Sequence, residues 1–365
     1  MKYIDGYRQG DAGKFLGKRI VENAALLADK HEPIYIMEVC GSHTMAISRF
    51  GIRDLLPPNV KLLSGPGCPV CVTDAGYIDA ALSLARKDVI IATFGDMVRV
   101  PGSKKSLADV RSEGADVRIC YSPAQAITLA QENPEREVVF MAIGFETTMA
   151  PVTTLIPSAE ACGLTNLSLL TAFKLVPPAL NALIADAEVK VDAFICPAHV
   201  SAIIGAEAYR PYVEERGVPC VVCGFEPLDI LYGIDNIVSQ FLNGECALVN
   251  QYSRVVTDAG NATAQKLFET FLTPVDAGWR GIGVIPMSGM GIREQYEKYD
   301  AAKRFGVSTD GGSPDPGCMC GDVLKGKIIP SDCPMFGDAC TPQNPVGPCM
   351  VSSEGSCAAY FKYER

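Results

Sequence analysis

Short apolar runs alternate with longer helical patterns between residues 34 and 250. The runs are rich in β-branched residues, as is typical of strands buried on both faces; they are residues 34–39, 60–64, 89–94, 138–143, 191–196 and 218–223. Between them, residues 75–87 and 123–133 place apolar side chains at helical spacing. Alternation of this kind predicts an α/β fold built from βαβ units with mostly parallel sheets.

A short repeat suggests how the chain is divided. Gly-Phe-Glu occurs at residues 144–146 and 224–226, each time at the end of a predicted strand, which indicates two similar α/β halves that separate near residues 120–135. A chain of 365 residues also exceeds what one core usually serves. We predict a first α/β domain over residues 1–130 and a second over 131–250, with the extreme N-terminus in the first domain or packed on a third.

The pattern changes after residue 250. Residues 263–272 and 291–305 look helical, and from Ser308 onward the chain is rich in Gly, Pro and Cys with little periodicity. Such a segment buries too little apolar surface to order itself and usually needs a metal or a docked surface. We therefore predict a mainly helical and irregular iron–sulfur domain over residues 251–365.

Charge and hydropathy exclude several classes of function. The net charge is −10 and no basic run is interleaved with aromatic residues, which argues against a nucleic-acid partner. No segment approaches the roughly 18 consecutive apolar residues of a membrane span, and the charged N-terminus lacks the apolar stretch of a signal peptide. We expect a cytoplasmic protein that acts away from membranes.

Cysteine is the outlier in the composition. The chain has 15 cysteines and 3 histidines, so a large metal site would have to be mostly thiolate. In a reducing compartment, clustered thiols more often signal metal or redox chemistry than a disulfide framework. Thiolate-rich coordination is typical of iron–sulfur clusters and of structural zinc.

Six of these cysteines lie near the C-terminus, flanked by Gly and Pro. They are Cys318, Cys320, Cys333, Cys340, Cys349 and Cys357. Backbone N–H groups can turn toward sulfur in such loops, as they do around iron–sulfur clusters. The segment lacks the paired C-x₂₋₄-C knuckles of zinc ribbons, so we favour a 4Fe-4S cluster over structural zinc.

Three further cysteines follow predicted strands near the N-terminus. Cys40 ends the first strand, and Cys68-Pro-Val-Cys71 follows a Gly-Pro-Gly turn and precedes a helix. Ligands bind at the carboxyl ends of strands in open α/β sheets, so these three thiols could converge, joined by His43. The context of Cys68 and Cys71 resembles that of redox CxxC motifs. The residues alone leave metal ligation and dithiol exchange both open.

Other candidates have an equally plausible structural role. Glu146 follows a strand and could be an acid–base group or a helix cap, and His199 could face the same crevice or be a core histidine. Cys220 and Cys223 also have CxxC spacing but lie in an apolar run, which predicts a strand with the two thiols on opposite faces. No nucleotide-binding glycine motif follows any strand.

Long motifs resemble one known family. They are "MEVCGSHTMAI", "LLSGPGCPVCVT", "GFETT", "PAHVSAIIG" and "DPGCMCG…CPMFGDACTP…GPCMVSSEGSCAAY", and together they span the chain. They are similar to the HypD family of nickel–iron hydrogenase maturation proteins. The resemblance implies two similar α/β domains and a cluster-bearing third domain. It also implies a scaffold on which iron acquires two cyanides and one carbonyl, Fe(CN)₂CO, with a HypC-type chaperone and a HypE-type cyanide donor as partners.

The resemblance also implies roles for individual residues. Cys40 would hold the nascent iron, shared with a cysteine of the chaperone, and Cys68 and Cys71 would be a redox dithiol or further iron contacts. The family's cluster spacing fits Cys320, Cys333, Cys340 and Cys357, which leaves Cys318 and Cys349 as unassigned thiols that could pair. The dithiol could pass electrons between cluster and iron site by thiol–disulfide exchange. Assembly scaffold is thus favoured over turnover enzyme; the alternatives are a thiol–disulfide oxidoreductase fed by the cluster, and a zinc-stabilised interaction module.

Overall fold

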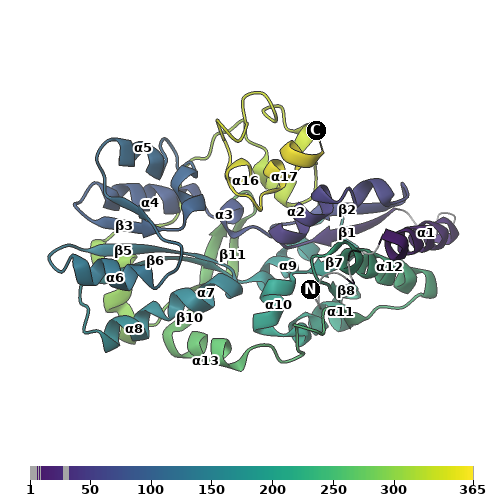
Figure 1. Ribbon diagram of the computed structural model, residues 1–365, viewed down its shortest axis with the longest axis horizontal. Coiled ribbons are helices and arrows are strands. Elements are labelled where there is room, and N and C mark those ends of the chain that lie inside the picture. The colour runs from purple at the N-terminus through teal and green to yellow at the C-terminus, as the bar shows by residue number, and fades with distance from the viewer. Residues whose placement is uncertain (1–5, 7, 9, 28–32, 365) are drawn as a thin grey trace.

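The computed structural model describes residues 6, 8, 10–27 and 33–364, so most of the extreme N-terminus lies outside the described residues. The backbone forms two separate sheets flanked by helices, which confirms the predicted α/β class (Figure 1). Over the described ranges, no helix is both long and apolar enough to cross a membrane.

Five parallel strands form the first sheet, called sheet A. In spatial order they are β2 (Val60–Ser64), β1 (Ile34–Glu38), β7 (Ala193–Cys196), β8 (Cys220–Val222) and β9 (Leu248–Asn250). Their side chains enter two different core clusters, with Ile36 on one face and Met37 on the other. Burial on both faces explains the continuous apolar runs. Cys220 and Cys223 likewise enter opposite clusters, as predicted.

Six strands form sheet B. In spatial order they are β10 (Leu272–Trp279), β11 (Gly283–Ile292), β6 (Leu167–Lys174), β5 (Val138–Gly144), β3 (Ile90–Thr93) and β4 (Val117–Ile119). The strands β6, β5, β3 and β4 are parallel, while the hairpin β10–β11 adds to the β6 edge antiparallel. Part of the segment predicted as helix, residues 291–305, therefore belongs to β11, and the rest forms a 3₁₀ turn (Glu294–Tyr299) and α14 (Ala301–Phe305).

The predicted domain boundaries at residues 130 and 250 do not follow the sheets. Sheet A takes its strands from residues 34–64 and 193–250, whereas sheet B takes its strands from residues 90–174 and 272–292. The chain crosses between the sheets after β2, after β6 and after β9. The division has to be redrawn because periodicity identifies strands but does not say which sheet each one joins. The two Gly-Phe-Glu copies do end strands of different sheets, β5 and β8.

Helices connect the strands and cover the sheets. They are α1 (Gly10–Leu27), α2 (Gly41–Arg49), α3 (Pro69–Val72), α4 (Ala75–Ala85), α5 (Leu107–Ser112), α6 (Gln125–Glu132), α7 (Glu146–Thr153), α8 (Leu155–Ala161), α9 (Val176–Ala185), α10 (Ala198–Ile204), α11 (Arg210–Arg216), α12 (Pro227–Asn243) and α13 (Ala262–Phe271). One core cluster draws residues from both sheets, among them Phe194 and Val139. The two halves therefore share a buried junction.

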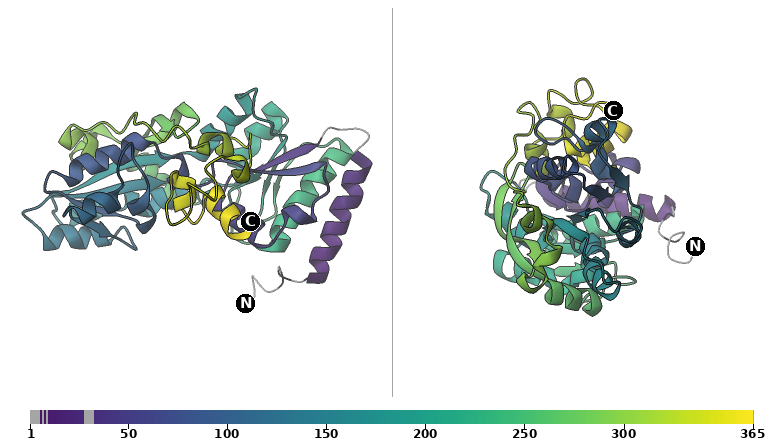
Figure 2. Two further views of the ribbon diagram at one scale, coloured as in Figure 1. Left: turned by 90° about the horizontal axis from the view of Figure 1, so that it is seen from above. Right: turned by 90° about the vertical axis from the view of Figure 1, so that its left-hand side faces the viewer.

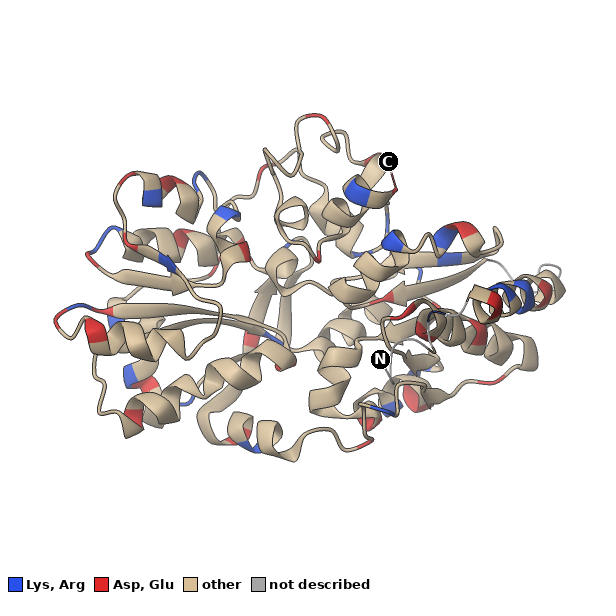
Figure 3. Ribbon diagram, viewed as in Figure 1, with Lys and Arg blue, Asp and Glu red and all other residues tan. Residues whose placement is uncertain are grey.

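The C-terminal segment packs over this junction. It contains the short helices α15 (Cys320–Leu324), α16 (Pro348–Val351) and α17 (Ser356–Tyr363), joined by irregular chain. Figure 1 and the left view of Figure 2 show it midway along the molecule, where the two halves meet. Acidic and basic residues are interspersed along the described ribbon, with both signs on the elements of each sheet (Figure 3).

Candidate functional site

A cavity of about 120 Å³ opens where strand ends of both sheets meet. Cys40 and Gly67 follow β1 and β2 of sheet A, while Thr147 and Thr148 follow β5 of sheet B. The remaining lining residues are Val39, Pro69, Phe145, Pro197, His199, Val200 and Glu354. Glu354, from the C-terminal segment, closes the cavity and accepts a hydrogen bond of 2.8 Å from the Ser42 hydroxyl. Three separate parts of the chain thus build one site around Cys40.

The Cys40 thiol is held in a neutral state by its surroundings. Its side chain is 7% exposed, and burial, with a further contribution from the Glu354 carboxylate, raises the pKa of this thiol to about 12. The Cys40 backbone N–H donates to the Glu38 carboxylate at 3.2 Å, and the Thr44 hydroxyl donates to its other oxygen at 2.5 Å. A cation bound at sulfur would displace the thiol proton, because thiolate is the metal-ligating form.

Two glycines let the loops approach closely at this point. The Gly41 N–H donates to the Gly67 carbonyl at 2.9 Å, which joins the loop after β1 to the loop after β2. A Cβ on Gly67 would lie 2.2 Å from the Cys40 backbone nitrogen, and one on Gly41 would lie 2.4 Å from Cβ of Glu354. Only glycine fits at these contacts, so both loops and the C-terminal segment depend on them.

Replacing Gly67 by alanine is expected to lower the free energy of unfolding by roughly 1–3 kcal/mol, because the clash is with backbone and no side chain can move aside. Denaturant unfolding followed by circular dichroism measures the loss. Gly17→Ala, in α1 with no atom within 4 Å of the new Cβ, is the matched control and should gain about 0.5–1 kcal/mol. Equal stability of the Gly67 variant and wild type would contradict the close approach.

A second prediction concerns Glu38, which is fully buried. Burial raises the pKa of its carboxyl from 4.5 to about 7. Between these values the folded chain keeps a proton that the unfolded chain has lost, so this group makes stability fall as pH rises and then level off above about 7. Glu38→Gln should match wild type near pH 4 and exceed it above pH 7 by a few kcal/mol, on the order of 3 at most.

Denaturant midpoints from pH 4 to pH 8 test this expectation. The exposed Glu135→Gln is the control and should leave the wild-type pH dependence unchanged. Glu146, whose pKa burial also raises to about 7, contributes a slope of the same sign that remains in the Glu38 variant. A Glu38 variant with the full wild-type slope would contradict the assignment.

The predicted polar candidates separate into cavity and core residues. His199 lines the cavity, and its ring packs against that of Phe225 at a tilt of 36°, with 4.3 Å between the ring centroids. His43 is fully buried, and its Nε2 lies 3.1 Å from the Cys223 carbonyl and 3.0 Å from the Gly224 carbonyl. Burial lowers the pKa of His43 to about 4, so it is a neutral donor that ties α2 to the end of β8. It does not line the cavity beside Cys40.

Glu146 also points away from the cavity that its neighbours line. Its Oε1 accepts a hydrogen bond of 3.0 Å from the Val176 N–H at the start of α9, and its side chain is 2% exposed. Of the two roles considered for Glu146, this contact corresponds to the helix cap. Its other oxygen has no partner among the described residues.

Cys68 and Cys71 are joined as a disulfide directly behind the cavity. Cys68 is the N-terminal cap of α3 and its Sγ accepts a hydrogen bond of 3.2 Å from the Cys71 N–H. The neighbouring residues Gly67 and Pro69 line the Cys40 cavity. The two sulfur residues are only 3% and 0% exposed, so an external thiol would reach them poorly.

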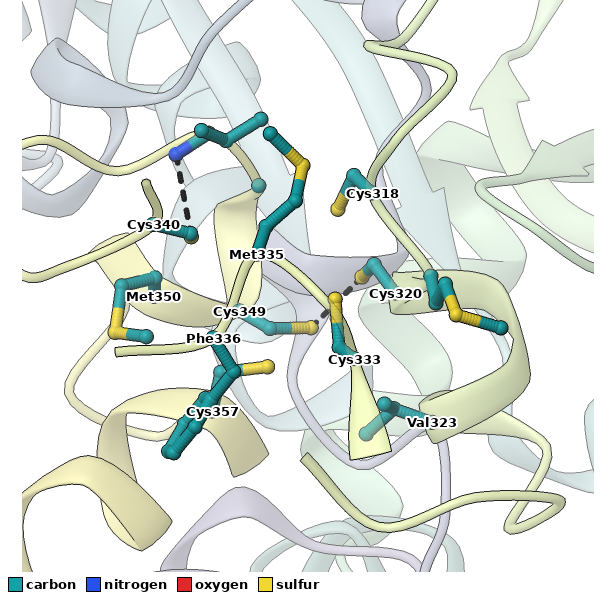
Figure 4. A pocket seen from close by; sticks show the side chains of 13 residues that line it. Cys318, Cys320, Val323, Cys333, Met335, Phe336, Cys340, Cys349, Met350 and Cys357 are labelled. Carbon is teal, nitrogen blue, oxygen red and sulfur yellow. Dashed lines mark hydrogen bonds between the residues drawn. The ribbon is translucent and has the colours of Figure 1, made fainter. Parts of the chain in front are cut away.

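All six C-terminal thiols line a second cavity. Cys318, Cys320, Cys333, Cys340, Cys349 and Cys357 surround it together with Met319, Met335, Phe336 and Met350 (Figure 4). The Val346 N–H donates to the Cys340 sulfur at 3.4 Å. An all-thiol donor set with N–H···S contacts in an apolar pocket suits an iron–sulfur cluster.

Within this cavity Cys320 is paired with Cys349. Their sulfurs lie 2.8 Å apart, and Figure 4 shows the two side chains pointing at each other. Hydrogen bonds from Cys318 and Cys349 lower the pKa of the Cys320 thiol. Among the described residues, no three Cys, His, Asp or Glu side chains already stand in coordination geometry, so the thiols share the cavity without converging on one point.

The tip of the β10–β11 hairpin joins the two sulfur sites. Arg280 donates from its backbone to the Val72 carbonyl at 2.8 Å and from Nε to the Thr73 carbonyl at 2.8 Å, both at the end of α3. The same guanidinium helps to lower the pKa of Cys320, and Gly281 lies directly against Gly321. On the other side, α16, which carries Cys349, packs on α3. The disulfide and the thiol cavity are therefore neighbours.

Sequence reasoning missed three residues of this arrangement. Glu38 and Glu354 flank Cys40, and Arg280 connects α3 to Cys320. Glu38 lies in a strand and Arg280 in a turn that was not predicted. At neither position does a single charged residue form a sequence pattern that would identify it as part of the site. Glu354 lies between Cys349 and Cys357 inside a quoted motif, and this position could have identified it as a candidate site residue.

Comparison with known proteins gives one consistent result. Residues 16–364 match the family model HypD, described as the hydrogenase formation hypA family. The hydrogenase maturation factor HypD of Azotobacter vinelandii is 46% identical over 373 aligned residues, covering 100% of this chain and 97% of its own. That of Escherichia coli K12 is 44% identical, covering 100% and 99%. A putative hydrogenase expression/formation protein of Methanocaldococcus jannaschii is 43% identical, covering 95% and 97%.

Proposed function

Because the chain belongs to the HypD family of hydrogenase maturation factors, we propose that it is the scaffold on which iron acquires two cyanides and one carbonyl. The observation that carries this proposal is the placement of Cys40, a single thiol in a cavity between the strand ends of both sheets. A HypC-type chaperone would supply a second thiolate, and a HypE-type protein would deliver cyanide.

Iron is the substrate at this site, and the chain's own residues prepare its first ligand. Cys40 is the cysteine that lines the cavity, and its high pKa keeps the sulfur protonated until a cation takes the proton's place. Thiolate is a soft ligand that suits low-valent iron. The imidazole of His199 and the carboxylate of Glu354 line the same cavity and can hold water or accept that proton.

A 4Fe-4S cluster is the resident cofactor that the second cavity fits best. Such a cluster would supply electrons one at a time. Spacing alone favoured Cys320, Cys333, Cys340 and Cys357 as its ligands. Since Cys320 and Cys349 already face each other, we assign the cluster instead to Cys318, Cys333, Cys340 and Cys357.

Four of the remaining cysteines, Cys68, Cys71, Cys320 and Cys349, would make a chain of redox thiols. Cys320 and Cys349, when reduced, can exchange with the Cys68–Cys71 disulfide: one pair loses two electrons and two protons and closes an S–S bond, while the other gains them and opens. The N–H···S contact at Cys68 favours its thiolate once the bond opens. The opened pair then stands behind Cys40 as reductant or as further iron contact.

The competing function is a general thiol–disulfide oxidoreductase. The burial of Cys68 and Cys71 argues against external disulfide substrates and favours reduction from within the molecule. We expect the double variant Cys68→Ser, Cys71→Ser to stop hydrogenase maturation, while the wild-type protein shows no appreciable turnover with a small disulfide. Normal maturation by the double variant would remove the dithiol from the proposed mechanism, and fast turnover by the wild type would favour the competitor.

Two measurements on anaerobically purified protein test the main proposal. Metal and sulfide analysis should find about four iron and four labile sulfide per chain, in addition to any iron at Cys40. Infrared spectra of the complex with its chaperone should contain cyanide and carbonyl stretches of bound iron. Zinc in place of iron and sulfide would indicate an interaction module, and a complex without these stretches would contradict the scaffold role.

A further inference from the structure

A third cavity, of about 130 Å³, shares no lining residue with either sulfur cavity. It is enclosed by the end of β6, the β10–β11 hairpin, the residues before α4, and a loop at residues 309–310. Unlike the thiol cavity it is polar, and its charged or hydroxylated lining residues are Thr73, Asp74, Tyr77, Thr171, Lys174, Asp276, Thr309 and Asp310. Neither the motifs nor the proposed function accounts for it.

Lys174 is the unusual residue of this cavity. It is the last residue of β6 and is 5% exposed, yet across residues 33–364 its ammonium group has no hydrogen-bond or ion-pair partner. Burial lowers its pKa to about 8, partly offset by the negative charges of Asp74 and Asp310. An ammonium group that faces a polar cavity without a direct hydrogen bond can donate to an acceptor supplied by a ligand.

Asp74 is a carboxylate in a similar position. It is the residue before α4 but makes no capping hydrogen bond, so its charge is left for the cavity. Gly278 of β10 makes room for it: a Cβ there would lie 2.0 Å from the Asp74 Oδ2. Burial raises the pKa of Asp74, and Lys174 and Arg280 act in the opposite direction.

Asp310 reaches the cavity from a loop that is fixed in place. The Gly76 N–H donates to the Gly311 carbonyl at 2.9 Å, and the Ser313 N–H donates to the Ser103 hydroxyl at 2.8 Å. These contacts hold residues 309–313 across the start of α4. Beside its hydroxyl groups, the cavity thus presents one ammonium group, from Lys174, and three carboxyl groups, from Asp74, Asp276 and Asp310.

We propose that this cavity binds a small zwitterion of the amino-acid class, with the ligand carboxylate on Lys174 and the ligand ammonium between Asp74 and Asp310. Lys174 can bind a ligand carboxylate, while the surplus of carboxylates from Asp74, Asp276 and Asp310 disfavours a simple anion and can bind a ligand ammonium. A zwitterion satisfies both. A cavity of about 150 Å³ holds a molecule the size of benzene, so the volume here admits glycine or alanine but not a large side chain.

Calorimetric titration of the full-length protein tests this with glycine and L-alanine, using glycolate and methylammonium as single-charge probes. We expect saturable one-to-one binding of an amino acid, and weaker or no binding of either single-charge probe. Lys174→Met should weaken binding at least tenfold, since a hydrogen bond to a charged group contributes about 1.5–3 kcal/mol. Asp74→Asn should weaken it similarly, and the exposed Lys87→Met is the matched control.

Four outcomes would overturn the proposal. These are the absence of saturable amino-acid binding to the wild type, unchanged affinity in both the Lys174 and Asp74 variants, an equal loss in the Lys87 variant, and glycolate or methylammonium binding as tightly as glycine. If Lys174→Met does not fold, Asp74→Asn and Asp310→Asn decide the question, because an amide of the same shape preserves packing. None of these measurements depends on iron or on hydrogenase maturation, so the scaffold proposal stands or falls separately.

Discussion

Cys40→Ala is expected to abolish the cyanide and carbonyl infrared bands of the iron centre and, in cells, to leave nickel–iron hydrogenase inactive. Cys40 is the cysteine that lines the cavity, and alanine offers iron no lone pair in its place. The fold should persist, because removing one buried sulfur costs only about 1 kcal/mol. Infrared spectroscopy of the purified complex and hydrogenase activity of the cells measure the two losses.

Cys120→Ala provides the matched control for this experiment. Cys120 is also buried, at 3% exposure, but it follows β4 at the far edge of sheet B and lines neither sulfur cavity. This variant should retain both bands. Full bands in the Cys40 variant would show that iron is assembled elsewhere, whereas loss of bands in both variants would mean only that the complex is fragile to any buried cysteine change.

The N-terminal half of the site could be predicted because strands carry a strong pattern. Cys40 and Cys68 each follow an apolar run, and parallel strands bring their carboxyl ends to one edge of a sheet. The pairing of β1 with β2 then makes their loops neighbours, which is confirmed by the bond from Gly41 to Gly67. Hydrophobic periodicity and parallel-sheet topology were therefore sufficient to predict that the loops carrying Cys40 and Cys68 are neighbours.

The connection to the second sulfur site could not be predicted in the same way. It depends on the β10–β11 hairpin, whose strands contain proline and several glycines and whose buried and exposed positions do not alternate, so they lack the pattern of a half-buried strand. The hairpin tip places Arg280 against α3 and Gly281 against Gly321. Contacts that depend on the close approach of two backbones and on one arginine side chain produce no recognisable pattern in the sequence.

The pairing of Cys320 with Cys349 could not be predicted from the sequence either. Spacing favoured Cys320 over Cys318 as the fourth ligand, but it carries no information on the direction in which either side chain points. Short helices decide between them: Cys320 begins α15 and Cys349 lies in α16, and their packing turns the two sulfurs toward each other. The proposed distinction between cluster ligand and exchange thiol therefore rests on side-chain direction.

The ligand assignment predicts opposite results for two neighbouring cysteines. Cys318→Ala should lose most of its iron and sulfide and the visible absorption of a 4Fe-4S cluster, because three thiolates remain where four are needed. Cys320→Ala should keep the cluster, because in the proposed assignment its sulfur pairs with Cys349, 2.8 Å away, and is not a ligand. Iron and sulfide analysis and absorption spectra of anaerobic protein separate the two cases.

Cys349→Ala tests the proposed thiol exchange through hydrogenase maturation as well as through cluster content. If Cys320 and Cys349 exchange with Cys68–Cys71, this variant should carry a normal cluster yet fail to mature hydrogenase, because the disulfide behind Cys40 is buried and stays closed without an internal partner. Loss of the cluster in Cys320→Ala, with retention in Cys318→Ala, would restore the ligand set that spacing favoured. Intact cluster and normal maturation in both Cys320→Ala and Cys349→Ala would instead remove the exchange step, leaving the cluster without a thiol route to the iron site.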